Sequence, residues 1–313
     1  PESTQSRLVI HILVARLHKQ IKNPTKAATH VQQALKIQPS SEEALKLYAQ
    51  LKGRAGELYT EATDHLLKNE PNKAIDCLKH AIELDPTDAR FLIRRGVIHR
   101  QLGSYNEAVL DLEKVLEMTN RNSADALRQL AITYNQLAIE LYAAKDYAQA
   151  LTVYDLALRH DDASSSIWVN RGDCHREMQE VGLALQDYLK AHQLNPGDKE
   201  TRIRLSTLYD ARGLTYFDRG LLFEAEAEFS HAIKYLPQVP HYYMHRATTC
   251  MESSNHKQAL LDYKKVVELD PGNEQAWARL TMLGDTSTAR PGPPPQPLPS
   301  INQHRRAGSG GGG

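Results

Sequence analysis

The chain has 313 residues, of which 41% are hydrophobic, so it is large enough to bury a substantial core. Its 38 basic and 38 acidic side chains cancel, which argues against a nucleic-acid partner or a membrane-surface partner. No run of about 18 apolar residues suggests a transmembrane helix. The three widely spaced cysteines predict a reducing, cytoplasmic compartment. Because the chain opens at Pro1 without a methionine, we expect it to be part of a longer protein.

An apolar helical stripe that ends at a turn residue recurs along the chain. The turn residues are Pro39, Pro86, Asn120, Asp162, Pro196, Pro237 and Pro271. Their successive spacings are 47, 34, 42, 34, 41 and 34 residues, and 34 is the period of a helix-turn-helix repeat. Counting back from these residues gives the units 8–41, 55–88, 89–122, 131–164, 165–198, 206–239 and 240–273.

Each unit repeats the same pattern of small and large side chains. The first helix carries a small residue, at Ala15, Ala62, Gly96, Ala138, Gly172, Gly213 and Ala247. The second carries an alanine, at Ala27, Ala74, Ala108, Ala150, Ala184, Ala225 and Ala259. A large apolar residue follows four later, at Val31, Leu78, Leu112, Tyr154, Tyr188, Phe229 and Tyr263. Small residues let helices approach closely and large ones fill the space beside them, so we predict an all-α, right-handed α-solenoid of about seven helix pairs.

The residues outside this period define the remaining segments. Residues 1–7 form a lead-in, and 42–54 form an irregular or extended-helix junction, where Gly53 and Gly56 predict a kink or short break. The segments 123–130 and 199–205 add about two turns to the first helix that follows each of them. The repeats therefore fall into the groups 55–122, 123–198 and 199–273, followed by a capping helix at 274–284. The Pro/Gly-rich segment 285–313 is expected to be a disordered tether, or a polyproline ligand.

The units over residues 8–273 resemble the tetratricopeptide repeat family. A closer resemblance within that family is carried by residues 91–118, 130–142, 169–178 and 241–247. That closer resemblance implies a non-catalytic scaffold of the ciliary or flagellar axoneme, with axonemal or microtubule-associated proteins as partners. The alternative is a soluble adaptor, cochaperone-like or a ciliary transport subunit, which grips short peptide segments.

The first helices are expected to line a concave groove, because helical spacing turns their second, fifth, ninth and twelfth positions to one side. We predict a protein-binding groove at Arg90, Ile93, Val97, Arg100, Asn135, Ile139, Tyr142, Asp173, Arg176, Asp210, Leu214, Phe217 and Met244. Arginines beside apolar pockets are typical of interface hot spots. Some of these apolar residues could instead pack between adjacent repeats. A chaperone-type carboxylate clamp would need Lys and Asn at inward positions, where Ile93 and Val97 stand.

No nucleotide-binding loop or strand pattern is present in the sequence, so we expect no enzyme, cofactor or small-molecule substrate. His241 and His245 could form a metal pair, although a groove patch is the simpler interpretation and no third ligand is evident. Cys174 and His175 are adjacent, and adjacent helical residues point apart. An arginine just before the small residue, at Arg95, Arg171, Arg212 and Arg246, could bridge to a neighbouring helix or hold a partner's carboxylate.

Overall fold

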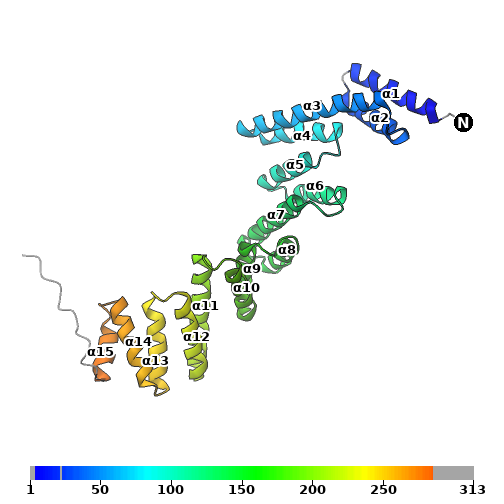
Figure 1. Ribbon diagram of the computed structural model, residues 1–313. Coiled ribbons are helices and arrows are strands. Elements are labelled where there is room, and N and C mark those ends of the chain that lie inside the picture. The colour runs from blue at the N-terminus through cyan, green and yellow to red at the C-terminus, as the bar shows by residue number, and fades with distance from the viewer. Residues whose placement is uncertain (1–3, 22, 285–313) are drawn as a thin grey trace, which may run out of the picture. The chain divides into compact units, whose positions relative to one another are not determined.

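The computed structural model describes residues 4–21 and 23–284, and every regular element in this part of the chain is an α-helix. The fifteen helices of the described residues form seven antiparallel pairs joined by short turns, and α15 follows the last pair (Figure 1). The expected all-α architecture of helix pairs is confirmed. The chain divides into two compact units, Pro1–Thr201 and Arg202–Gly313, which are described separately. No described helix is long and apolar enough to cross a membrane.

The first unit contains five helix pairs. They are α1 (Thr4–Gln20) with α2 (Pro24–Ile37), α3 (Glu42–Leu67) with α4 (Pro71–Leu84), α5 (Ala89–Gln101) with α6 (Tyr105–Met118), α7 (Ala124–Ala143) with α8 (Tyr147–His160), and α9 (Ser165–Glu177) with α10 (Val181–Leu194). Within this unit α2, α4, α6 and α8 each also pack against the first helix that follows. The first helices α5, α7 and α9 contact one another in turn, so they form one continuous face.

The second unit contains two helix pairs and a terminal helix. These are α11 (Lys199–Asp218), which begins just before the unit boundary, α12 (Leu222–Tyr235), α13 (Pro240–Glu252), α14 (His256–Leu269) and α15 (Glu274–Met282). Helix α15 packs against α14 and buries Ala276, Trp277 and Leu280. The Trp277 indole also donates a hydrogen bond to the Pro271 carbonyl at 3.0 Å. Because α15 covers the last repeat, it acts as the expected capping helix.

The turn inside each of the last six pairs uses the same backbone device. One residue adopts a left-handed conformation with φ between 58° and 76°, at Asn69, Gly103, Lys145, Gln179, Gly220 and Ser254. The following N–H then returns to a carbonyl near the end of the first helix, as in the bond of 2.8 Å from Glu180 N to His175 O. All six residues hold the same place in the 34-residue units, which supports the repeat register.

The core is built from the small and large residues of the repeat pattern. All seven small first-helix residues, all seven second-helix alanines and all seven large residues are buried. The contact is closest where glycine faces an aromatic ring. A Cβ added at Gly172 would lie 2.7 Å from the Tyr188 ring, and one added at Gly213 would lie 2.6 Å from the Phe229 ring. At these two positions a side chain would collide with the ring, whereas Ala138 and Ala247 hold the same place in the units that carry Tyr154 and Tyr263.

The first helices that follow a longer spacing are extended. Helices α7 and α11 have 20 residues each, and both contain the additional turns expected for them. Helix α3 has 26 residues and runs unbroken through 42–54, so this junction is an extended helix, one of the two forms expected, and the predicted short break near Gly53 is wrong. Gly53 and Gly56 are exposed, and a Cβ added at either would meet nothing within 4 Å, so no packing force disrupts the helix there. Helix α1 also begins earlier than expected, at Thr4 inside the predicted lead-in.

The proline-rich and glycine-rich segment 285–313 lies outside the described residues, and so do the disorder, tether and polyproline interpretations of it.

Candidate functional site

The predicted groove residues of α5 line one hollow in the first unit. This hollow has a volume of about 350 Å³ and is lined by residues of α3, α5 and α7: Tyr59, Arg90, Ile93, Arg94, Val97, Arg100, Asp125 and Gln129. All four positions expected to face inward from α5 are among them. The helical spacing therefore placed these four residues on the side of α5 that lines the hollow.

Arginines dominate the polar part of this hollow. Arg90 is mostly exposed and forms a bidentate ion pair with Asp88, with a shortest contact of 2.6 Å. Arg100 donates to the Gln129 side chain at 2.8 Å, and burial lowers the pKa of the Arg100 guanidinium. Arg94 Nε is buried and has no hydrogen-bond partner within the described chain. With Ile93 and Val97 as the apolar residues, the hollow suits a segment that carries both carboxylates and apolar side chains.

The groove residues of α7 and α9 are partly occupied by contacts inside the fold. Asn135 Oδ1 accepts a hydrogen bond from Asn170 at 3.1 Å, which links α7 to α9. Asp173 accepts one from the buried Tyr188 hydroxyl at 2.6 Å. Asn135 therefore helps to join two repeats, and Asp173 helps to pack α9 against α10 within one repeat. Arg176 is exposed and lies 3.6 Å from Asp173, so it is accessible at the edge of α9.

The two remaining residues of α7 differ in their surroundings. Ile139 is exposed to solvent, as an interface residue must be. The Tyr142 ring is half-buried and lies 5.4 Å from the Tyr147 ring of α8, so part of its surface is used within the repeat.

The second unit has a smaller hollow of its own. It has a volume of about 80 Å³ and is lined by Leu214, Phe217, Phe229, His245, Thr248 and Thr249. The predicted residues Leu214 and Phe217 lie in it, whereas Met244 packs against the core formed by the last repeat and α15. Asp210 lies 2.7 Å from His245 Nδ1 and so connects α11 to α13.

The recurring arginines bridge helices. Arg95, Arg171 and Arg246 each form a bidentate pair with an aspartate of the second helix, at distances between 2.6 and 2.8 Å. The aspartates Asp111, Asp187 and Asp262 are buried. Asp187 raises the pKa of the Arg171 guanidinium by accepting its hydrogen bonds. The bridging interpretation is therefore confirmed for these arginines.

Arg212 forms the corresponding pair with a glutamate. Its Nη2 lies 3.0 Å from Glu228 Oε1, while the other Glu228 carboxylate oxygen has no hydrogen-bond partner among the described residues. Burial raises the pKa of the Glu228 carboxyl. This pair is the least well satisfied of the four.

The weaker chemical candidates have other partners. The described residues contain no group of three or more His, Cys, Asp or Glu side chains that could hold a metal ion. Cys174 Sγ donates to the Tyr147 carbonyl at 3.7 Å, and His175 Nδ1 lies 2.7 Å from Glu180. Burial raises the pKa of Cys174 to about 11, so this thiol is protonated at neutral pH.

Four residues of the α5 hollow were not predicted from the sequence: Tyr59, Arg94, Asp125 and Gln129. Arg94 follows Arg90 by one turn, so its spacing could have placed it on the same face. Asp125 and Gln129 lie in the additional turns of α7, outside the 34-residue units in which positions were counted. Counting groove positions along the whole helix would have found them.

Known proteins share these repeats. Models described as tetratricopeptide repeat match residues 59–126, 135–199 and 240–273, together more than half of the chain. Tetratricopeptide repeat protein 16 of Mus musculus is 29% identical over 84% of this chain and 35% of its own length. Hsp70-Hsp90 organizing protein 2 of Arabidopsis thaliana is 26% identical over 68% of this chain and 35% of its own length.

The chain thus spans about a third of the length of these relatives. Among solved structures, a tetratricopeptide repeat protein from Parabacteroides merdae matches with a TM-score of 0.40 and 19% identity, over 74% of this chain and 100% of its own. The closer resemblance expected within the family is thereby identified as one to tetratricopeptide repeat protein 16. The chain belongs to the tetratricopeptide repeat family, whose helical arrays are scaffolds for protein–protein interaction.

Proposed function

We propose that this chain is a non-catalytic scaffold that binds other proteins through its first helices, within a ciliary or flagellar axoneme. The observation that carries the binding proposal is the α5 hollow, where Arg90, Arg94 and Arg100 surround Ile93 and Val97. An open hollow that combines guanidinium groups with apolar side chains offers both charge recognition and desolvated contact area. The proposed ligand is a protein segment that carries acidic and apolar residues.

The axonemal part of the proposal is supported by the similarity to tetratricopeptide repeat protein 16 over most of the chain. A built-in scaffold should use a large surface, and this chain offers the hollow on α5 and a separate one in the second unit. We propose axonemal or microtubule-associated proteins as the partners.

The binding proposal is tested with one substitution in each hollow and a matched control elsewhere. Arg100→Glu reverses the charge in the first unit, and Lys114→Glu on the exposed side of α6 is its control. Phe217→Ala removes an anchor in the second unit, and Phe223→Ala, at a side chain that is 83% exposed on α12, is its control. We expect Arg100→Glu and Phe217→Ala to lower the yield of axonemal proteins in a pull-down, with thermal unfolding midpoints close to that of the unsubstituted chain. Equal yields for all four variants would exclude both hollows as binding sites.

A soluble adaptor is the second candidate function, and the similarity to Hsp70-Hsp90 organizing protein 2 favours it. The α5 hollow differs from a chaperone-type carboxylate clamp because Ile93 and Val97 occupy two of its inward positions. An adaptor would bury one short peptide, whereas a built-in scaffold would stay attached to its assembly.

A salt-extraction series on isolated cilia, followed by proximity labelling from this protein, separates the two functions. Retention in the axoneme up to high salt, with labelling of microtubule-associated neighbours, supports the scaffold. Release with the soluble matrix, with labelling of chaperones or transport subunits, supports the adaptor and contradicts the axonemal proposal.

A further inference from the structure

The α5 hollow continues into a second hollow near the end of α5. This turn hollow has a volume of about 390 Å³ and lies beside the turn between α3 and α4. Arg94 and Val97 line both hollows, so the two meet at these residues. The other apolar residues that line the turn hollow are Leu66, Pro71, Ile98 and Leu102.

The two hollows follow one another along the first helices. On α3 the lining passes from Tyr59 in the α5 hollow to Leu66 in the turn hollow, and on α5 it runs from Arg90 to Leu102. At a rise of about 1.5 Å per residue, this path along α5 is about 18 Å long. An extended chain covers about 3.3–3.6 Å per residue, so a segment of about five or six residues is long enough to occupy both hollows.

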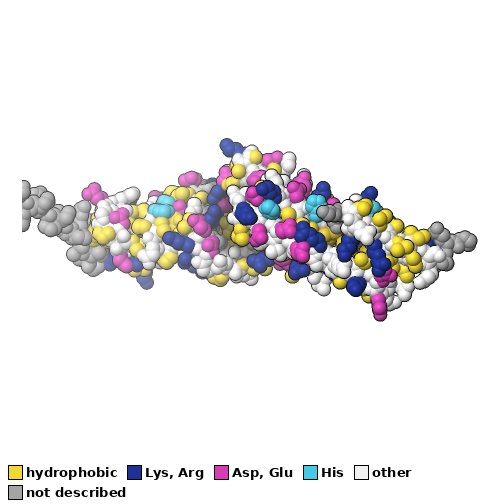
Figure 2. Space-filling view, turned by 90° about the horizontal axis from the view of Figure 1, so that it is seen from above, with side chains coloured by type: hydrophobic (Ala, Val, Ile, Leu, Met, Phe, Trp, Pro, Cys, Tyr) yellow, Lys and Arg dark blue, Asp and Glu magenta, His cyan; other side chains and the backbone are white. Residues whose placement is uncertain are grey.

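The two ends of this path differ in charge. The α5 hollow contains three arginines and one acidic residue, Asp125, whereas no acidic residue of the described chain lines the turn hollow. Leu102 of the turn hollow is 45% exposed and so offers apolar surface to a ligand. Figure 2 shows Lys and Arg side chains intermingled with Asp and Glu side chains over the first unit. The excess of arginine in the α5 hollow is therefore a local feature.

Arg94 stands where the charged and the apolar parts of the path meet. Its Nε is buried and has no hydrogen-bond partner among the described residues, whereas the neighbouring Arg95 is paired with Asp111. A buried donor without an acceptor destabilises the unbound state. A ligand that places a carboxylate oxygen at Arg94 removes this cost, so the middle of the path favours an acidic side chain.

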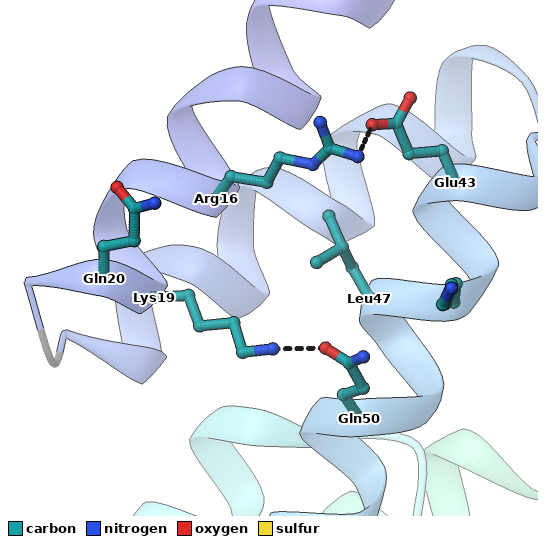
Figure 3. Close-up of a pocket in the computed structure, with 7 residues that line it drawn as sticks. Arg16, Lys19, Gln20, Glu43, Leu47 and Gln50 are labelled. Carbon is teal, nitrogen blue, oxygen red and sulfur yellow. Dashed lines mark hydrogen bonds and ion pairs between the residues drawn. The ribbon is translucent and has the colours of Figure 1, made fainter.

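The larger hollow between α1 and α3 is less suited to an acidic ligand. It has a volume of about 440 Å³, and two of its basic side chains already have partners within the fold. Figure 3 shows Arg16 directed to Glu43 and Lys19 directed to Gln50 across this hollow. A ligand carboxylate would have to displace these partners, which Arg94 Nε does not require.

We propose that the partner segment runs along α5 through both hollows, with carboxylate side chains at one end and aliphatic side chains at the other. The carboxylates pair with the arginines of the α5 hollow, and the one nearest the middle accepts a hydrogen bond from Arg94 Nε. The aliphatic side chains cover Leu66 and Leu102 in the turn hollow. This placement rests on the proposed function, because it assumes that the α5 hollow binds a partner. It adds the order of acidic and apolar residues along that partner.

The order is tested with short peptides of one composition whose two termini are blocked. Two ordered peptides carry glutamates at one end and leucines at the other, in opposite chain directions, and a third peptide alternates glutamate with leucine. We expect one ordered peptide to bind the full chain about tenfold more tightly than the alternating peptide in fluorescence anisotropy, with an affinity that falls as salt is raised. A leucine peptide whose free C-terminus is its only carboxylate should not compete with it.

Substitutions in the middle and at the far end of the path locate the bound segment. Arg94→Gln should weaken binding of the ordered peptide by about tenfold. It should not lower the thermal unfolding midpoint, because Arg94 Nε has no partner to lose. Arg94→Lys should retain part of the affinity, because it keeps the charge. Leu102→Ser should weaken binding by about fivefold, because an apolar contact is lost.

Two matched controls lie on second helices of the same unit. Arg159→Gln is at an exposed arginine of α8, and Leu110→Ser is at a leucine of α6 that is 70% exposed. Both variants should bind the ordered peptide as the unsubstituted chain does.

The outcomes separate this placement from the proposed function. The placement is overturned if neither ordered peptide binds saturably, if the alternating peptide binds equally well, or if Arg94→Gln and Leu102→Ser leave binding unchanged. If Arg100→Glu still lowers the pull-down of axonemal proteins in that case, the α5 hollow remains a binding site and the proposed function stands. If Arg100→Glu has no effect either, both fail. Competition by the leucine peptide through Arg94 would assign this arginine to a chain terminus, which also contradicts the placement.

Discussion

Replacing Gly172 with alanine tests the closest contact between the two helices of a repeat. The added Cβ would lie 2.7 Å from Tyr188 Cε1, 2.8 Å from Cδ1 and 3.2 Å from the Cβ of Asp187. Normal carbon–carbon contacts are about 3.5–4.0 Å, so the ring or the helix must move by close to 1 Å. Tyr188 cannot move freely, because it is fully buried and its hydroxyl donates to Asp173 at 2.6 Å.

The expected magnitude is the difference between two opposing effects. Overpacking a buried site costs about 1–3 kcal/mol, and straining the hydrogen bond to a carboxylate adds about 1 kcal/mol. Replacing glycine with alanine within a helix by itself raises the free energy of unfolding by about 1 kcal/mol. We therefore expect Gly172→Ala to lower the free energy of unfolding by about 2 kcal/mol, and Gly172→Leu to lower it by more.

Urea unfolding followed by circular dichroism measures the change, and hydrogen exchange shows whether it is confined to α9 and α10. Gly53→Ala is the matched control, because a Cβ at Gly53 meets nothing within 4 Å. It should raise the free energy of unfolding by about 0.5–1 kcal/mol. Adding Tyr188→Leu should relieve part of the cost of Gly172→Ala, so the two effects should not add. If Gly172→Ala is as stabilising as Gly53→Ala, the proposed close packing is refuted.

Three further predictions concern the repeats. Asp187→Ala should destabilise the first unit by about 3–5 kcal/mol, because it leaves the half-buried Arg171 without its main partner. Asp88→Ala, which breaks an ion pair with a largely exposed arginine, should cost less in the same urea titration, and equal losses would contradict this ranking. Gln179→Gly should stabilise by about 1 kcal/mol, because φ at this residue is 63°; a lower unfolding midpoint would show that the turn tolerates a side chain without strain. Burial, with the neighbouring His11 and His18, lowers the pKa of His30. As the pH falls through the ordinary histidine pKa of about 6.5, the unfolded chain therefore binds more protons than the folded chain, and the folded state loses stability. The α1–α2 pair should therefore lose hydrogen-exchange protection when the pH is lowered from 7.5 to 5.5, and His30→Gln should reduce that loss. Increased protection at the lower pH would contradict the lowered pKa of His30.

The register of the repeats could be predicted from the sequence, because the sizes of the side chains that pack between the two helices of a unit set it. Gly172 and Tyr188, for example, can be paired from their places in one unit, since both side chains belong to the same two helices. The groove was harder to predict, because exposure depends on neighbouring units. Asn135 and Asp173 occupy inward positions, yet Asn170 and Tyr188 donate hydrogen bonds to them. Asn170 lies in the unit after that of Asn135, so a rule based on positions within a single unit cannot detect it. Tyr188 lies on the second helix of the unit that contains Asp173, and counting positions along the first helices alone leaves it out.

The exposure of Ile10 and Leu17 on α1, 45% and 55%, has a related cause. Ile10 and Leu17 fit the apolar pattern of a first helix, and the pattern alone assigns them to the core. Their exposure follows from the absence of a packed second helix in front of α1 within the described residues. Hydrophobic spacing shows which faces are suited to packing, but it does not show whether another element covers them.

The alternation of short and long spacings suggests a division of roles within each group of repeats. The bidentate Arg–Asp pairs occur in the units that directly follow another repeat, and two of these arginines also reach the preceding second helix. Arg171 contacts Asp155 of α8 at 2.7 Å, and Arg246 donates to Ser230 of α12 at 2.9 Å. These units are therefore joined firmly to their predecessors, while the extended helix α7 contributes Asp125 and Gln129 from its additional turns to the α5 hollow. Substitutions at the paired arginines should act mainly on stability, and substitutions in the additional turns of α7 should act mainly on binding. If Gln129→Ala lowers the unfolding midpoint as much as Asp187→Ala, this division does not hold.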